Sequence, residues 1–131
     1  MDHVLAAIDG SDNSMRALSF ATEFAVNFDA TLHAVHVSDA ETGATEAVLD
    51  EAREVVADMA VDADLELLEV SEMPVRSAHA AAKELLTYAA DEEIDHIVIG
   101  HHGAGRVERA ILGSASETMV RGATVPVTVV P

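Results

Sequence analysis

Short apolar runs alternate with longer amphipathic stretches along this chain. Runs rich in Val, Ile, Leu and Ala have the length of buried strands and lie at residues 4–8, 31–37, 65–70, 94–99 and 125–130. The stretches between them repeat apolar residues at helical spacing and lie at residues 11–28, 45–63, 77–91 and 114–121. Ser11 is a residue type that caps helices, and it predicts the start of the first one. This alternation of strand and helix predicts an α/β fold with a parallel sheet.

The order of these elements favours a doubly wound, five-stranded parallel sheet with helices on both faces. We expect this Rossmann-like domain to span residues 1–131, because no linker or low-complexity tract divides the chain. Pro126 cannot donate a hydrogen bond to a neighbouring strand, which places the last strand near a sheet edge. In such folds a ligand binds beyond the carboxyl ends of the strands, where the winding reverses. Asp9 and Gly100 follow two strands that we expect to be adjacent at that point.

The composition limits the partners that this chain can have. It carries 24 acidic and 7 basic residues, and the formal net charge of −17 argues against binding to nucleic acids or anionic membranes. Such an acidic surface favours a halophilic source, although an ordinary acidic, soluble surface explains the same counts. No apolar run approaches the roughly 18 residues of a membrane span, and no signal peptide is recognisable. We therefore expect a cytoplasmic protein, and one without disulfides because it has no cysteine.

The glycine-rich segment before the last predicted helix carries the most specific chemical signal. Two residues lie between Gly100 and Gly103, and nine residues lie between Gly103 and the pair Gly113 and Ser114. Glycines let the backbone approach an anion closely, and the free N–H groups at a helix start point towards it. The Asp-Gly-Ser segment at residues 9–11 follows the first predicted strand. Together the two segments predict a nucleotide pocket.

Each of these signals also has a purely structural interpretation. Ser114 and Glu117 have the spacing of a capping box, and Asp9 can form an Asx turn with the residues that follow it. Three of the seven basic residues lie in or just after the glycine-rich segment: Arg106, Arg109 and Arg121. Either they neutralise a polyphosphate or they pair with neighbouring glutamates. The sequence leaves these alternatives open.

On these motifs the whole chain resembles the universal stress protein family, in its nucleotide-binding branch. The glycine spacing is the most specific match, and residues 33–37 and 125–127 match the second and last strands of the family. The resemblance implies an adenine-nucleotide alpha-hydrolase-like fold that binds ATP, or ADP or AMP, between the glycine-rich segment and the first strand. It implies nucleotide contacts at these positions: Ala7, Ile8, Asp9, Val37, Ile99, Gly100, His102, Gly103, Gly113, Ser114, Ala115 and Ser116. Within this set, Asp9 would contact the ribose or a divalent metal, Mg²⁺ or Mn²⁺, and Val37 would contact adenine through its backbone.

The resemblance further implies a nucleotide-dependent regulatory or stress-response module that forms a homodimer through its last strand. The alternative is a weak ATP-hydrolysing enzyme of the same fold, and the enzyme question stays open. Hydrolysis needs a base that activates a positioned water, for which Asp9 and His102 are the candidates. No Walker-type lysine is present, because Lys83 lies in a predicted helix away from the glycine-rich segment. We therefore expect a nucleotide-binding protein rather than an efficient enzyme.

Overall fold

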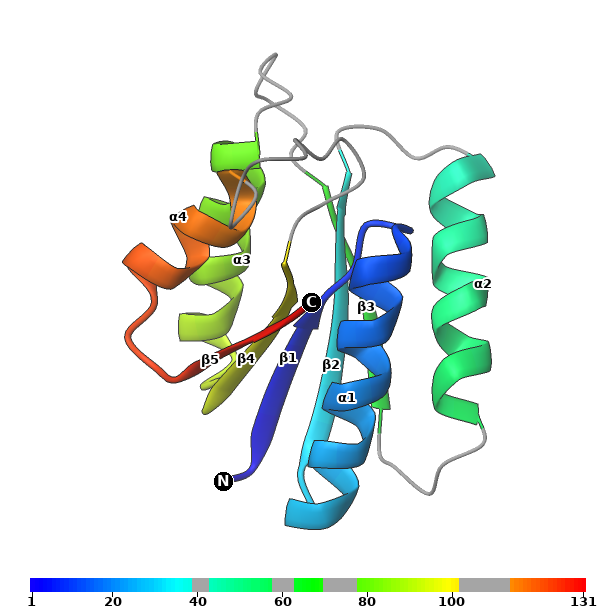
Figure 1. The fold of residues 1–131 in the computed structure, drawn as a ribbon, viewed down its shortest axis with the longest axis horizontal. Coiled ribbons are helices and arrows are strands. Elements are labelled where there is room, and N and C mark those ends of the chain that lie inside the picture. The colour runs from blue at the N-terminus through cyan, green and yellow to red at the C-terminus, as the bar shows by residue number, and fades with distance from the viewer. Residues whose placement is uncertain (39–42, 58–62, 70–77, 102–113) are drawn as a thin grey trace.

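The computed structural model describes residues 1–38, 43–57, 63–69, 78–101 and 114–131, in which strands and helices alternate (Figure 1). The elements follow one another in this order: β1 (His3–Ala7), α1 (Asp12–Phe28), β2 (Thr31–Ser38), α2 (Gly43–Ala57), β3 (Ala63–Glu69), α3 (Ala78–Asp91), β4 (His96–Gly100), α4 (Ser114–Gly122) and β5 (Val127–Val130). None of the helices in these residues is long and apolar enough to cross a membrane.

The strands form one sheet in the order β3-β2-β1-β4-β5, and all of its pairings are parallel. Strand β1 lies between β2, where Ala7 is in register with Val35, and β4, where Ala6 is in register with Val98. The chain therefore moves outward from β1 to β3 and then returns to the other side of β1. The predictions of an α/β fold and of a parallel sheet are confirmed, and β5 lies at a sheet edge as Pro126 predicts.

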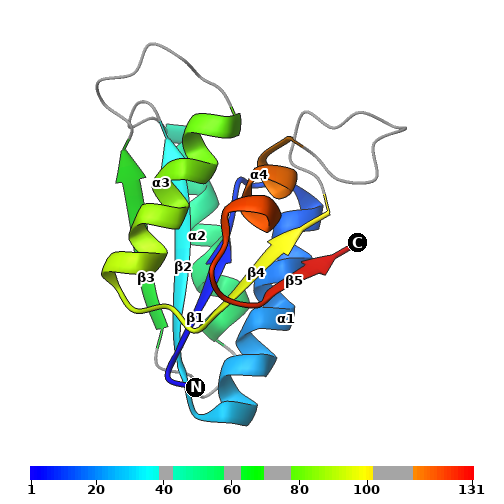
Figure 2. The same cartoon turned by 90° about the vertical axis from the view of Figure 1, so that its left-hand side faces the viewer.

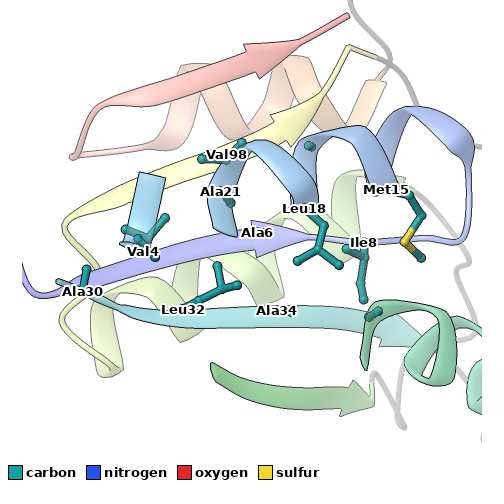
Figure 3. Packing of buried hydrophobic residues seen from close by; sticks show 13 residues of the cluster. Val4, Ala6, Ile8, Met15, Leu18, Ala21, Ala30, Leu32, Ala34 and Val98 are labelled. Atoms are coloured by element: carbon teal, nitrogen blue, oxygen red, sulfur yellow. The ribbon is translucent and has the colours of Figure 1, made fainter. Parts of the chain in front are cut away.

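Two apolar clusters occupy the two faces of the sheet. On one face α1 and α2 cover a cluster that contains Val4, Leu18 and Leu32 (Figure 3). On the other face, where Figure 2 shows α3 and α4, these helices cover a second cluster. Leu85 and Met119 contribute to it. Odd and even positions of β1 face opposite clusters, because successive side chains of a strand alternate in direction. Burial of both faces explains why the interior of β1 and of β4 consists of apolar residues without a polar one between them.

Most element ends lie within two residues of the prediction, and the differences that have a structural reason are the following. Helix α2 ends at Ala57, and Ala63 already belongs to β3, where it is in register with Leu32. Strand β5 begins at Val127, after Pro126, whose carbonyl still accepts a hydrogen bond from Ile97 (3.0 Å). Phe28, which the helical spacing places on the apolar face, is 54% exposed in the last turn of α1.

Candidate functional site

The carboxyl ends of β1 and β4 lie side by side. They form part of the edge at which the strands terminate, which is distinct from the lateral edge formed by β5. Because the strands are parallel and Ala6 is in register with Val98, the residues that follow β1 lie next to Gly100. Helix α1 begins at this edge directly after β1, and the start of α4 is joined to the same edge by a hydrogen bond described below. The N-terminus of a helix carries a partial positive charge, which favours an anion at this edge.

The turn between β1 and α1 is held by side-chain hydrogen bonds. The carboxylate oxygen Oδ1 of Asp9 accepts a hydrogen bond from the Ser11 backbone N–H (2.9 Å), which is the Asx turn that the sequence left open. Asp9 in turn donates its own backbone N–H to the Ser14 hydroxyl (3.1 Å). Gly10 has a φ of +85°, a conformation that glycine adopts without strain. Asp9 is therefore exposed on a turn of defined conformation.

The first turn of α1 is capped as the sequence predicts. The Ser11 hydroxyl accepts a hydrogen bond from the backbone N–H of Ser14 (3.1 Å). The Ser14 hydroxyl donates to the Ser11 carbonyl (3.0 Å), and Ser14 is 4% exposed. These bonds fix the direction in which the helix leaves β1.

Gly100, at the end of β4, is in contact with both helices. A Cβ atom on this glycine would lie 2.9 Å from the side-chain oxygen of Asn13, 3.1 Å from its carbonyl carbon and 3.2 Å from its carbonyl oxygen. The Ser116 hydroxyl, in the first turn of α4, donates to the Gly100 carbonyl (2.7 Å). Asn13 is 4% exposed and Ser116 is 7% exposed. The glycine therefore joins the first turns of α1 and α4.

The remaining predicted site residues lie in different surroundings. Ile8 and Ile99 are buried in the two opposite apolar clusters, so their side chains are committed to the core. Ala7 is half-buried at the end of β1, and Val37 is in β2, in register with Leu68. Ser114 and Ala115 open helix α4. The other predicted contacts lie outside the described residues: His102, Gly103 and Gly113.

Of the three basic residues in or just after the glycine-rich segment, Arg121 alone lies among the described residues. Arg121 forms an ion pair with Glu117 (3.0 Å) one helical turn away, and both side chains are more than half exposed. This supports the interpretation that Arg121 offsets a neighbouring glutamate. Arg106 and Arg109 lie outside the described residues. Within the part of the chain that the structure describes, no group of three or more His, Asp or Glu side chains could hold a metal ion.

Two residues at this edge were missed by the sequence reasoning. Asn13 lies against Gly100, and a buried polar residue directly after a helix cap was its only local signal. The Nδ1 atom of His36 is 2.8 Å from the Ile8 carbonyl, which can only accept, so Nδ1 carries the hydrogen. His36 therefore ties the end of β2 to the end of β1, which sequence spacing alone does not reveal.

Comparison with known proteins adds the family. The model of the universal stress protein family matches residues 1–131. The chain is similar to a universal stress protein of Methanocaldococcus jannaschii, at 28% identity in an alignment 145 positions long that covers 97% of this chain and 80% of that protein. Its fold is similar to that of a universal stress protein in complex with cAMP (TM-score 0.75, 23% identity, 99% of this chain and 96% of that one). It is also similar to that of the universal stress protein of Archaeoglobus fulgidus in complex with dAMP (TM-score 0.75, 20% identity, 100% and 98%).

Proposed function

We propose that this chain, which belongs to the universal stress protein family, binds an adenine nucleotide at the carboxyl ends of β1 and β4. The observation that carries this proposal is the meeting of two helix N-terminal turns at Gly100, beside the β1–α1 turn. In our interpretation this edge is the switch point of a doubly wound sheet, where ligands of such folds bind. The two helix starts would favour a phosphate in a molecule whose net charge is −17. The cAMP and dAMP complexes of the relatives support adenine as the base.

We propose that ATP, ADP or AMP is the ligand and that backbone groups supply most of its contacts. The side chains of Ile8 and Ile99 are buried, so these two residues can offer only backbone atoms. Gly100 has no side chain and the Ser116 hydroxyl already donates to it. The contacts at Val37, His102, Gly103, Gly113, Ser114 and Ala115 are proposed from the resemblance alone.

We propose that Asp9 serves the ribose or a divalent metal that arrives with the nucleotide. Its carboxylate is exposed beside the edge, and carboxylate oxygens are ligands that Mg²⁺ prefers. Because the described residues form no cluster of three metal ligands, such an ion would depend on the phosphates for most of its coordination. Binding of Mg–ATP and of metal-free ATP by the variants Asp9→Asn and Asp9→Ala separates the two roles. Asparagine serves as the control for the turn, because it can keep the hydrogen bond to Ser11 without the charge. A metal role predicts that both variants weaken Mg–ATP more than metal-free ATP, whereas a ribose role predicts equal losses for the two ligands.

We further propose a regulatory role, in which a homodimer responds to nucleotide through its last strand. Strand β5 lies at the sheet edge, and each of its residues is only partly buried. An open edge with unpaired backbone groups can pair with the same edge of a second copy. Sedimentation at micromolar concentration tests this, and a monomer at all salt concentrations would contradict it. A cytoplasmic location and a halophilic source belong to the same proposal, and greater thermal stability in molar KCl than in low salt would support the latter.

Calorimetric titration tests the binding proposal directly. The purified, nucleotide-free protein is titrated with ATP, ADP, AMP and cAMP, with and without magnesium, and GTP serves as the control for the base. We expect binding of at least one adenine nucleotide and weaker binding of GTP. Mass spectrometry of the denatured protein as first purified provides a second reading, since a tight ligand co-purifies. No binding of any of the four adenine nucleotides at millimolar concentration would refute the proposal.

A further inference from the structure

We infer that Ser116 serves the proposed nucleotide site as a positioning residue, and that it acts through Gly100 rather than by contact with the ligand. The Ser116 hydroxyl donates to the Gly100 carbonyl over 2.7 Å, and the Ser116 residue is 7% exposed. A hydroxyl has one hydrogen, so the donor of Ser116 is not available to a phosphate oxygen while this bond exists. The hydroxyl of Ser116 therefore supports a neighbouring element, which leaves only the backbone of this residue for the predicted contact with the nucleotide.

The bond fixes one helix start to the end of a central strand. Ser116 lies in the first turn of α4, and Gly100 is the last residue of β4. Further along α4, Met119 is 1% exposed in the apolar cluster under the helix. The cluster holds the helix on the sheet, whereas the hydroxyl bond sets where its first turn stands relative to the strand end.

The same glycine is enclosed from the other face of the sheet. The backbone of Asn13 lies 3.1–3.2 Å from the position that a Cβ atom of Gly100 would occupy. Asn13 belongs to the first turn of α1, which packs on the opposite face to α4. The first turns of two helices are therefore placed relative to each other through one residue of β4. Loss of the Ser116 bond would free only the α4 side of this junction.

The consequence for binding depends on which part of the nucleotide α4 faces, and here the inference rests on the proposed function. If the helix start serves the phosphates, a displaced first turn weakens ligands in proportion to their phosphate content. The bond is internal to the protein, so its loss changes the Kd only if binding must return the displaced first turn to its place. That return then costs about as much as one neutral hydrogen bond, which corresponds to about a three- to tenfold change in an equilibrium constant. We expect Ser116→Ala to raise the Kd of ATP by about three- to tenfold and the Kd of adenosine less than twofold.

The chain offers a matched control for the loss of a buried hydroxyl. Thr22 donates its hydroxyl to the Leu18 carbonyl over 2.7 Å and is fully buried, but it lies in the middle of α1, away from the edge. Thr22→Val and Ser116→Ala both remove a buried hydroxyl of this kind, so a purely structural role predicts the same binding for both. Ser116→Thr keeps the hydroxyl and should restore ATP binding to within about twofold of the unsubstituted protein.

Titration of all three variants with ATP, AMP and adenosine, beside urea unfolding of each, gives the test. A selective loss of ATP affinity in Ser116→Ala, absent from Thr22→Val and restored in Ser116→Thr, is the expected result. Equal losses for ATP and adenosine, or unchanged ATP binding by folded Ser116→Ala, would overturn the inference while the unsubstituted protein still binds ATP. Failure of the unsubstituted protein to bind any nucleotide would instead refute the proposed function. If Ser116→Ala does not fold, Ser116→Cys replaces it, because a thiol fills similar space and donates only weakly.

Discussion

Replacement of Gly100 by alanine tests the junction between β4 and α1 by the smallest possible change. The added Cβ would stand 2.9 Å from the Asn13 side-chain oxygen and 3.1–3.2 Å from the Asn13 backbone. A side-chain oxygen can rotate away, but the backbone can move only if the first turn of α1 moves with it. This turn is held by the Ser11 cap and the Asp9 hydrogen bonds, so the strain cannot be relieved without weakening these bonds.

The magnitude follows from two opposing effects. Overpacking of a rigid site costs about 1–3 kcal/mol in the free energy of unfolding. Alanine also restricts the unfolded chain more than glycine does, which returns about 0.4–1 kcal/mol. We therefore expect Gly100→Ala to lower the stability by about 1–2 kcal/mol, which corresponds to a urea midpoint about 0.5–1 M lower.

Gly122→Ala is the control, because the clash there is of a different kind. A Cβ atom on Gly122 would lie 2.7 Å from Cδ1 of Leu86, which is the far end of a flexible side chain. Rotation of Leu86 relieves this contact, and we expect a change of less than about 0.5 kcal/mol. Urea unfolding followed by circular dichroism measures both variants. If Gly100→Ala is as stable as the unsubstituted protein, the contact with the Asn13 backbone is not a constraint and the reasoning is refuted.

Two further predictions concern the stability of the domain. Asp29 is the C-cap of α1, with a φ of 53°, and its carboxylate lies at a helix C-terminus whose last turn has no basic residue. Glycine adopts a positive φ without strain and carries no charge, so Asp29→Gly should raise the free energy of unfolding by about 0.5–1 kcal/mol. A lower thermal midpoint would contradict this. Burial lowers the pKa of His96, whose ring packs at a tilt against Phe24 (4.7 Å between ring centroids) and whose Nε2 atom lies 2.7 Å from the Thr128 hydroxyl. The unfolded state therefore binds more protons as the pH falls through the ordinary histidine range, and stability should decrease from pH 7 to pH 5. The slope of stability against pH should be shallower in His96→Gln, and an unchanged slope would assign it to other groups.

The sequence predicts those parts of the fold whose signals are local. The start of α1 is marked by Ser11 and its body by the spacing of Leu18 and Ala21, and the structure has the cap and the buried face where expected. The predicted end of the second helix was wrong, because apolar residues continue past Ala57 towards Ala63. Pairing with Leu32 of β2 makes Ala63 part of a strand, and the residues around Ala63 do not predict this pairing with a distant segment.

In the candidate site, too, the features with local signals were predicted and those formed between distant segments were not. The pairing of Arg121 with Glu117 and the Asx turn at Asp9 follow from short spacings, and both were among the alternatives that the sequence offered. The role of Gly100 could not be inferred from spacing, because its neighbour Asn13 lies in helix α1, far from β4 in the sequence, and the close approach involves backbone atoms. For Gly100 of the proposed nucleotide site there are therefore two independent reasons for a glycine. One is access for a ligand, and the other is close packing of a helix on the strand end.

The two reasons make different predictions: ligand access predicts that Gly100→Ala loses affinity at unchanged stability, whereas helix packing predicts that stability falls whether or not nucleotide is present. Unfolding of Gly100→Ala with and without saturating ATP separates them, and the distances to Asn13 favour the second.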